Sequence, residues 1–142
     1  MTTIMLIRHG DTDWNVEEIF RGRADIELNE VGIKQAELLA KYLADERIVA
    51  IYSSPLKRAL KTAEIIASSH HFDIIGAPEL IDFDYGEWQG LSHDTVRQKY
   101  KALYDEWLRN PHLVKIPKGE SLDDVRKRAI SLVNQVCEFS GK

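Results

Sequence analysis

The sequence has a single cysteine, Cys137, so no disulfide can form within the chain, and we expect a protein of the reducing cytoplasm. It has no run of about 18 apolar residues that would span a membrane. Its first residues, MTTIML, lack the basic start and long apolar stretch of a signal peptide. Basic residues are also scarce: 19 Lys and Arg stand against 23 Asp and Glu, a net charge of -4. This balance argues against a general nucleic-acid-binding protein, which normally needs a basic face. We therefore expect no membrane and no nucleic-acid partner.

Patterns for binding metals and nucleotides are missing as well. His93 and His112 have no cysteine or acidic partner at the spacing of metal ligands, and His70-His71 closes a predicted helix. No Walker loop and no Gly-rich nucleotide-binding pattern occurs. We therefore expect neither a metal nor a cofactor.

At 142 residues the chain has the length of one domain, which we predict to span 1–142. Short apolar runs at 4–7, 49–52 and 74–75 predict buried strands. Between them, helical periodicity follows capping residues, which are Asn29, Ser54, Ser92 and Ser121. Alternating strands and helices are typical of an α/β fold with a mainly parallel sheet.

The stretch LIRHGDTDWN ends the first predicted strand on Arg8 and His9, and the chain turns at Gly10. Ligands of open α/β sheets bind outside the carboxyl ends of the strands, where a strand-end side chain is held firmly. A neutral imidazole there is able to attack phosphorus, so His9 is a candidate nucleophile. The alternative is a strand-end histidine that only satisfies a backbone carbonyl.

Two arginines favour the nucleophile. Arg8 precedes His9, and Arg58 lies in the first turn of the helix after the second strand. A guanidinium fork matches phosphate oxygens, although Arg58 taken alone is more typical of a helix surface. A proton donor for the leaving alcohol is also required. Four carboxyls in or near the aromatic loop DFDYGEWQG are candidates for this acid: Glu79, Asp82, Asp84 and Glu87. The properties of the residues alone do not decide which of them it is.

Together these motifs resemble the histidine phosphatase superfamily, the phosphoglycerate mutase-like proteins. The matching stretches are LIRHGDTDWN, FRGRADIELNEVGIKQA, IYSSPLKRALKTAEII, LIDFDYGEWQGL and PKGESLDDVRKRA. The resemblance implies a three-layer sandwich with helices on both faces of the sheet. It also implies that His9 is transiently phosphorylated, that Arg8 and Arg58 hold the phosphoryl oxygens, and that Asp82 is the acid. The implied substrate-binding residues are Arg8, His9, Gly10, Asp11, Thr12, Asp13, Trp14, Asn15, Arg21, Gly22 and Arg58.

Three departures from the family pattern stand out. Asp82 occupies a position where glutamate is usual, which shortens its reach by one methylene, so that Glu79 or Asp84 remains an alternative acid. Arg21 replaces a common glutamine and adds a cation near the pocket mouth. The family's second catalytic histidine follows the last helix, and the sequence ends before it. We therefore expect a C-terminally truncated domain that is itself inactive if that histidine is essential.

The predicted function is hydrolysis of a phosphomonoester, a small phosphorylated metabolite, by a cytoplasmic histidine phosphatase. The loop DFDYGEWQG, residues 82–90, which carries Asp82, is called the acid loop below. In the family, mutases carry an insertion between this loop and PKGES, and the shortness of that stretch here favours a phosphatase over a mutase. Phosphoglycerate mutase-type phosphoryl transfer remains the alternative within the enzymes. A non-catalytic phosphate-binding remnant is the alternative outside them. The substrate and a homodimeric state are left open.

Overall fold

The computed structural model describes residues 2–139, and β1 (Ile51–Ser53) and β2 (Ile74–Gly76) form a parallel two-stranded sheet in it. Ile51 pairs with Ile74 and Ser53 with Gly76. The α-helices are α1 (Asp13–Val16), α2 (Glu30–Leu43), α3 (Lys57–Ala67), α4 (His93–Lys99), α5 (Lys101–Arg109) and α6 (Leu122–Phe139). The 3-10 turns are η1 (Pro78–Leu80), η2 (Gly86–Trp88) and η3 (Pro111–Leu113). The predicted α/β class with parallel strands is thereby confirmed.

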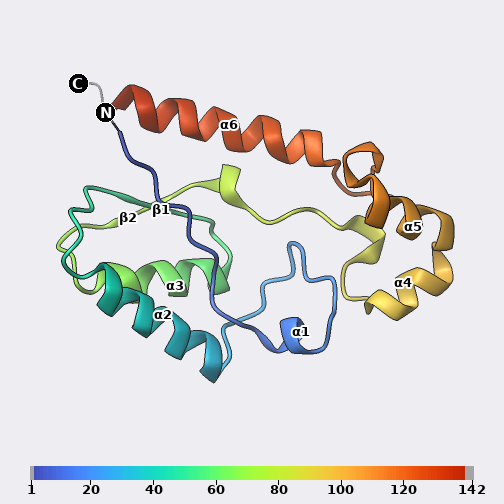
Figure 1. Cartoon of the computed structure of the whole chain (residues 1–142), viewed down its shortest axis with the longest axis horizontal. Helices are drawn as coiled ribbons and strands as arrows, with labels where there is room; N and C mark the ends of the chain where they lie inside the picture. The colour runs from blue at the N-terminus through green and yellow to red at the C-terminus, as the bar shows by residue number, and fades with distance from the viewer. Residues whose placement is uncertain (1, 140–142) are drawn as a thin grey trace.

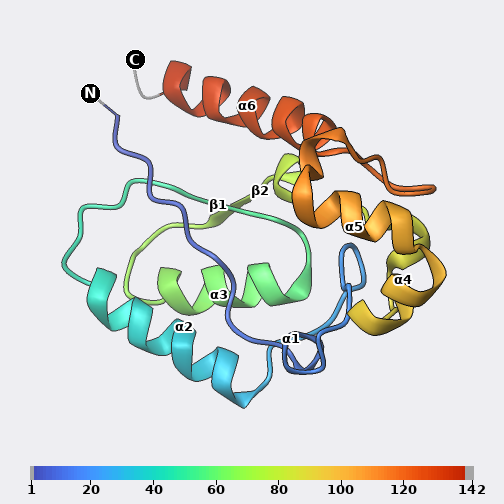
Figure 2. The ribbon, with the colours of Figure 1, turned by 45° about the vertical axis from the view of Figure 1, so that its right-hand side comes forward.

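The helices lie on different sides of the strands. Figures 1 and 2 show α2 and α3 on one side of β1 and β2, and the long α6 on the other. Helices α4 and α5 lie at the far end of the molecule from the C-terminal end of α6. The described residues include no helix that is long and apolar enough to cross a membrane.

The predicted strand at 4–7 is wrong: this segment has no regular secondary structure. Its apolar side chains are exposed, most of all Leu6, at 90%. The apolar composition favours a strand, but a strand exists only where a neighbour completes its hydrogen-bonded ladder. Within residues 2–139 the ladder consists of β1 and β2 alone.

Helix starts follow the predicted caps in three of four places. Asn29 accepts a hydrogen bond from the Gly32 amide at 2.9 Å and begins α2. Ser121 and Asp124 exchange the reciprocal bonds of a capping box at the start of α6. Ser92 accepts from the Thr95 amide and begins α4.

Two helix boundaries differ from the prediction. Helix α3 begins at Lys57 rather than beside Ser54, whose hydroxyl accepts from the Leu56 amide instead. The helix predicted after Ser92 is broken at Tyr100, whose φ of -127° leaves the helical region and separates α4 from α5. This break turns α5 back onto the aromatic core.

The larger hydrophobic cluster lies under the acid loop rather than under the sheet. Its buried members come from α4, α5, η2 and the loops around them: Phe20, Phe83, Trp88, Val96, Tyr104, Val114 and Ile116. A smaller cluster of Ala40, Leu43 and Ile66 joins α2 to α3. The acid loop is therefore supported by aromatic packing. The loop at residues 8–28, called the nucleophile loop because it carries His9, is supported by the pair of helices α2 and α3.

Candidate active site

Two glycines bring the nucleophile loop against α2. A Cβ on Gly10 would meet the backbone carbonyl of Gly32, and a Cβ on Gly32 would meet the carbonyl of Asp11. The Gly10 amide also donates to the Thr62 hydroxyl of α3 at 3.2 Å. Backbone contact with α2 and a hydrogen bond to α3 thus fix the residue that follows His9.

The surroundings of His9 favour its neutral form. Its Nδ1 lies 2.7 Å from the Gly10 carbonyl oxygen, which only accepts, so Nδ1 carries the proton and Nε2 keeps its lone pair. Burial lowers the pKa of His9, and the positive charges of Arg58 and Arg21 lower it further, against the opposing Gly10 hydrogen bond and Asp82 charge. A neutral imidazole with a free nitrogen is the form able to act as a nucleophile.

Arg58 lies at the second residue of α3 and is 1% exposed. Its Nη1 donates to the Ala24 carbonyl at 2.7 Å, and its Nη2 donates to the Gly22 carbonyl at 2.6 Å. The same Nη2 forms an ion pair with Asp82 Oδ2 at 2.9 Å. A guanidinium removed from water in this way needs acceptors on several sides, and these three provide them.

Asp82 is the one of the four candidate carboxyls that the structure brings to Arg58 and His9. Its Oδ1 accepts from the Phe83 amide at 2.7 Å, while Oδ2 faces Arg58. The carboxylate of Glu87 is instead bound by Lys118 and by the Tyr100 hydroxyl.

The other two candidate carboxyls have different surroundings. Asp84 accepts from the Gly86 amide at 2.9 Å and lies 3.7 Å from Arg23. Glu79 lies in the η1 turn and contributes its carbonyl, which accepts from Arg128 at 2.7 Å. Of the four candidate carboxyls, Asp82, which the family resemblance indicates as the acid, is therefore the one that lies near His9.

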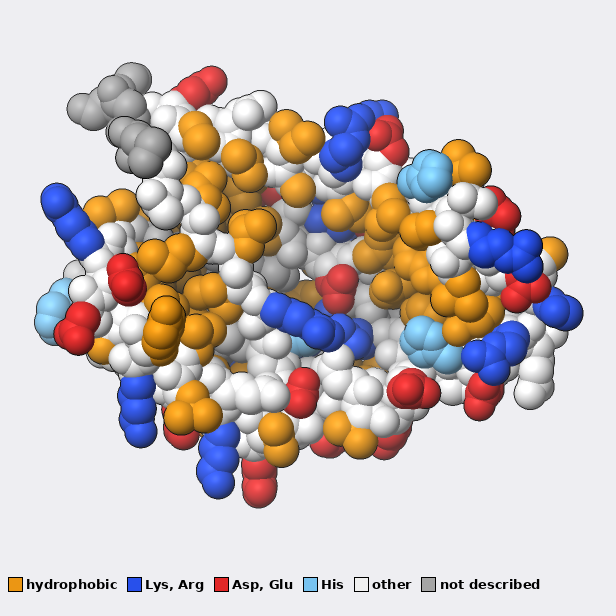
Figure 3. Space-filling view, in the orientation of Figure 1, with side chains coloured by type: hydrophobic (Ala, Val, Ile, Leu, Met, Phe, Trp, Pro, Cys, Tyr) orange, Lys and Arg blue, Asp and Glu red, His pale blue; other side chains and the backbone are white. Residues whose placement is uncertain are grey.

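Positive charge converges on this place. The pKa of Arg21 is lowered by burial, and the charges of Arg58 and Arg8 lower it further while Asp82 opposes them. The Nε of Arg21 is buried and has no hydrogen-bond partner among residues 2–139. Figure 3 shows basic and acidic side chains meeting at a hollow near the middle of one face. Arg58 and Arg21 act on the Asp82 carboxylate, and the charge of Arg8 acts on Arg21, so positive charge exceeds negative charge here and favours an anion.

The predicted substrate-binding loop divides into two kinds of residue. Thr12 is fully buried and forms a capping box with Asn15, whose Oδ1 accepts from the Thr12 amide at 3.0 Å. Asp11 bonds with Gln35, and Asp13 accepts from Asn29 at 3.4 Å. These four side chains shape the loop through contacts inside the protein.

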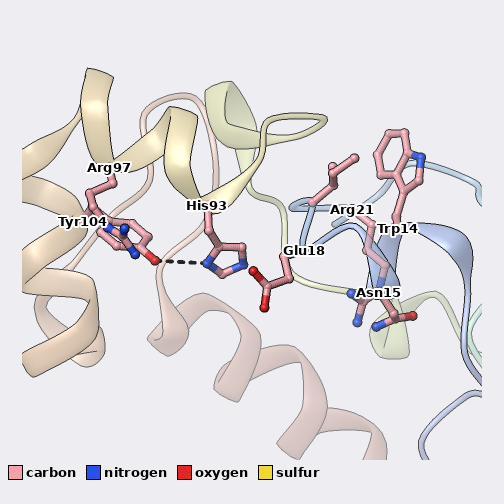
Figure 4. A pocket seen from close by; sticks show the side chains of 8 residues that line it. Trp14, Asn15, Glu18, Arg21, His93, Arg97 and Tyr104 are labelled. Carbon is pink, nitrogen blue, oxygen red and sulfur yellow. Dashed lines mark hydrogen bonds between the residues drawn. The ribbon is translucent and has the colours of Figure 1, made fainter.

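The other two residues of the predicted set have different surroundings: Trp14 lines a cavity (Figure 4), and Gly22 lies against the acid loop. Trp14 is half-buried and lines a cavity together with Asn15 and Arg21. Gly22 has a φ of +49°, and a Cβ there would lie 2.8 Å from the Phe83 carbonyl oxygen. Only glycine combines this left-handed backbone with so close an approach to the acid loop.

Sequence reasoning missed Arg128 of α6, which holds the acid loop in place. Its Nη1 donates to the carbonyls of Glu79 and Ile81 at 2.7 and 2.5 Å, and Nη2 donates to that of Asp82 at 3.3 Å. Its Nε and Nη2 donate to the two carboxylate oxygens of Glu120. The PKGES match placed Glu120 in a family motif, but no local signal indicated these carbonyl partners.

Glu120 connects this arrangement to the loop after the nucleophile. It accepts from the Asp84 amide at 2.9 Å and pairs with Arg23 at 3.2 Å. Burial alone would raise the pKa of Glu120, but the hydrogen bonds from Arg128 and the Asp84 amide outweigh it and lower that pKa.

Comparison with known proteins places this geometry in a family. The family described as "Histidine phosphatase superfamily (branch 1)" matches residues 4–142. Phosphoserine phosphatase 1 of Hydrogenobacter thermophilus is 38% identical over 136 residues, covering 96% of this chain and 64% of the relative. The metal-independent phosphoserine phosphatase of Arabidopsis thaliana is 37% identical, covering 97% of this chain and 59% of the relative.

A solved structure of mycobacterial glucosyl-3-phosphoglycerate phosphatase with VO3 superposes with a TM-score of 0.86 at 32% identity. The match covers 92% of this chain and 64% of that one. The chain thus spans less than two thirds of the length of these three proteins.

Gly32→Ala is expected to lower the free energy of unfolding by at least about 1 kcal/mol, because the clash with the Asp11 carbonyl outweighs the roughly 1 kcal/mol gained in helix propensity. Gly76→Ala is the matched control, since a Cβ there meets nothing within 4 Å. Urea unfolding of both variants measures the difference. Equal effects of the two substitutions would show that the loop does not depend on contact with α2.

Arg128→Gln is expected to destabilise the protein by about 3 kcal/mol, because it leaves Glu120 and three carbonyls without their shared donor. Arg126→Gln, on the same helix, changes the free energy of unfolding by no more than about 0.5 kcal/mol, since the ion-pair partner of Arg126 within residues 2–139 is the exposed Asp123. Denaturant titration compares the two variants. Similar losses in both would contradict the role of Arg128 in holding the acid loop.

Proposed function

Because the chain belongs to the histidine phosphatase superfamily, we propose that it hydrolyses a small phosphate monoester through a phosphohistidine on His9. The observation that carries this proposal is that His9, whose pKa is lowered by burial and by the charges of Arg58 and Arg21, shares its place with the Asp82 carboxyl. The orphaned Nε of Arg21 supports an oxyanion ligand at this position. The names of the relatives support a phosphatase and offer two kinds of ester, a phosphoserine and a glucosyl phosphoglycerate.

The proposed chemistry proceeds in two displacements. The Nε2 lone pair of His9 attacks phosphorus, the bond to the alcohol oxygen breaks, and protonated Asp82 gives its proton to the leaving alcohol. Water then attacks the phosphohistidine, Asp82 takes a proton from that water, and inorganic phosphate departs from a restored His9. The guanidinium groups stabilise the negative charge on the phosphoryl oxygens in both steps.

The fold supports a finer proposal on architecture. With α2 and α3 on one side of the strands and α6 on the other, we propose the three-layer α/β sandwich that the family resemblance implies. In this arrangement the site lies at the carboxyl end of β1, where ligands of α/β sheets bind.

His9→Ala is expected to reduce hydrolysis of an aryl phosphate to less than about a hundredth of the parental rate, because no other group provides the nucleophile. His71→Ala, at an exposed position outside the site, leaves the rate unchanged. Phosphate release in the presence of EDTA is the assay, and mass spectrometry of rapidly quenched protein identifies the phosphorylated peptide. A phosphoryl group on a peptide without His9 would contradict the assignment.

The stability of the protein is expected to depend on the protonation of His9. The unfolded chain has the ordinary histidine pKa of 6.5, and the folded protein has a lower one. Below about pH 6.5 the unfolded state therefore binds a proton that the folded state does not. As the pH is lowered below about 6.5, the free energy of unfolding therefore decreases, until the pH has passed below the pKa of His9 in the folded protein.

His9→Gln removes this contribution. Urea unfolding between about pH 7.5 and pH 5 is expected to show a steeper loss of stability in the wild type than in the variant. Parallel pH profiles for the two proteins would mean that the pKa of His9 is not lowered by folding.

A further inference from the structure

One hydroxyl of α3 is bound to both halves of the candidate site. Thr62 is 4% exposed and lies one helical turn after Arg58. Its Oγ1 donates to the Arg58 carbonyl at 2.8 Å. The amide of Gly10, the residue next to His9, donates to the same Oγ1 at 3.2 Å. A single side chain therefore joins the backbone beside the candidate nucleophile to the helical turn that carries Arg58.

The two hydrogen bonds use the Thr62 hydroxyl in a defined way. A hydroxyl has one proton to donate and lone pairs to accept with. The Arg58 carbonyl only accepts, so the Thr62 proton is directed toward it, and a lone pair of Oγ1 is left for the Gly10 amide, which only donates. The branched Cβ of threonine leaves its side chain few rotamers, and the bond to the carbonyl one turn earlier selects one of them. The Gly10 amide thus has an acceptor in a fixed position.

Burial makes this contact hard to replace. Gly10 and Thr62 are both buried, and within residues 2–139 Thr62 Oγ1 is the acceptor of the Gly10 amide. The next amide of the loop, that of Asp11, donates to Oε1 of the exposed Gln35 at 2.9 Å, where water is able to take the place of the side chain. A buried amide without an acceptor is costly, because no water reaches it. Loss of the Thr62 hydroxyl is therefore expected to displace the chain at Gly10.

Such a displacement would act on the distance between the attacking nitrogen and the bound phosphoryl group. The Arg58 guanidinium is held by acceptors from two loops, so a shift of the chain at Gly10 moves His9 relative to it. We propose that Thr62 is a positioning residue, whose hydroxyl sets the place of His9 relative to Arg58 and so brings the nucleophile into line with the phosphorus. This inference rests on the proposed function and adds to it a residue that acts through Gly10.

Thr62→Val keeps the branched shape of the side chain and removes the hydroxyl. The kcat for an aryl phosphate is expected to fall about 10- to 100-fold, since a displacement of about 1 Å at a reacting group has an effect of this size. KM is expected to change by less than about threefold, because the arginines that bind the phosphoryl group remain.

Two further variants frame this result. Thr62→Ser keeps the hydroxyl and is expected to retain kcat within about threefold of the wild type. Ser68→Ala is the matched control, because the exposed Ser68 also donates from its hydroxyl to a carbonyl of the same region, that of Ile65 at 2.6 Å, and lies away from the loop. Its kcat is expected to equal that of the wild type.

Two ligands separate positioning from a general loss of structure. Inorganic phosphate is bound by the arginines alone, whereas orthovanadate resembles the five-coordinate transition state only when the nucleophile is in line with it. By calorimetry, Thr62→Val is expected to bind phosphate within about threefold of the wild type and orthovanadate at least about tenfold more weakly.

Hydrogen exchange of the wild type tests the contact without any substitution, and so applies even if Thr62→Val does not fold. The Gly10 amide, followed by NMR, is expected to exchange far more slowly than the amides of exposed loop residues. Exchange as fast as theirs would show that Thr62 does not hold this amide, and would overturn the proposal.

The kinetic and binding results have equally distinct meanings. Thr62→Val with the kcat of the wild type, or with phosphate and orthovanadate weakened alike, would overturn the positioning role. In either case, hydrolysis of the aryl phosphate by the wild type would leave the proposed function intact. If the wild type hydrolyses no ester and binds neither anion, the proposed function fails, and the positioning role fails with it.

Discussion

The buried guanidinium of Arg58 is the contact on which the site depends. A charge with almost no access to water must be surrounded by acceptors, and the chain supplies them from two separate loops. The carbonyls of Gly22 and Ala24 belong to the loop after the nucleophile, and Asp82 belongs to the acid loop. One side chain of α3 therefore fixes both loops relative to the helix. Burial lowers the pKa of His9, and the same guanidinium lowers it further, so the group that organises the site also favours the neutral form of the candidate nucleophile.

A second arginine does for α6 what Arg58 does for α3. The Arg128 guanidinium donates hydrogen bonds to carbonyls at the start of the acid loop and to the Glu120 carboxylate, and Glu120 also forms an ion pair with Arg23. The sheet within residues 2–139 has two short strands and offers little backbone pairing to hold loops. Planar, permanently charged side chains replace that pairing, since each one satisfies several carbonyls at once. The aromatic cluster beneath then excludes water from one side of the acid loop.

Local features of this chain were readable from its sequence. Caps at Asn29, Ser92 and Ser121 depend on residues three positions apart, and the order of elements follows from periodicity. The expectation that His9 and Arg58 act together rested on their places after predicted strands, of which the one at 4–7 does not form, and the choice of Asp82 needed the family resemblance. Features that depend on distant partners were not readable. The run at 4–7 has strand-forming residues without a ladder neighbour in the described part of the chain. Likewise, nothing near Arg128 indicates that it meets carbonyls more than forty residues away.

The position of Trp14 gives the molecule a built-in optical reporter. Trp88 is buried in the aromatic cluster and Trp107 packs against it, whereas Trp14 lines the cavity beside Asn15 and Arg21. A solute entering that cavity changes the polarity around one indole and does not contact the other two, which lie outside the cavity lining. The intrinsic emission of the unlabelled protein therefore contains a constant background from the core and a variable part from the cavity. Ligand occupancy can be followed by this variable part in real time, with no dye attached and no residue replaced.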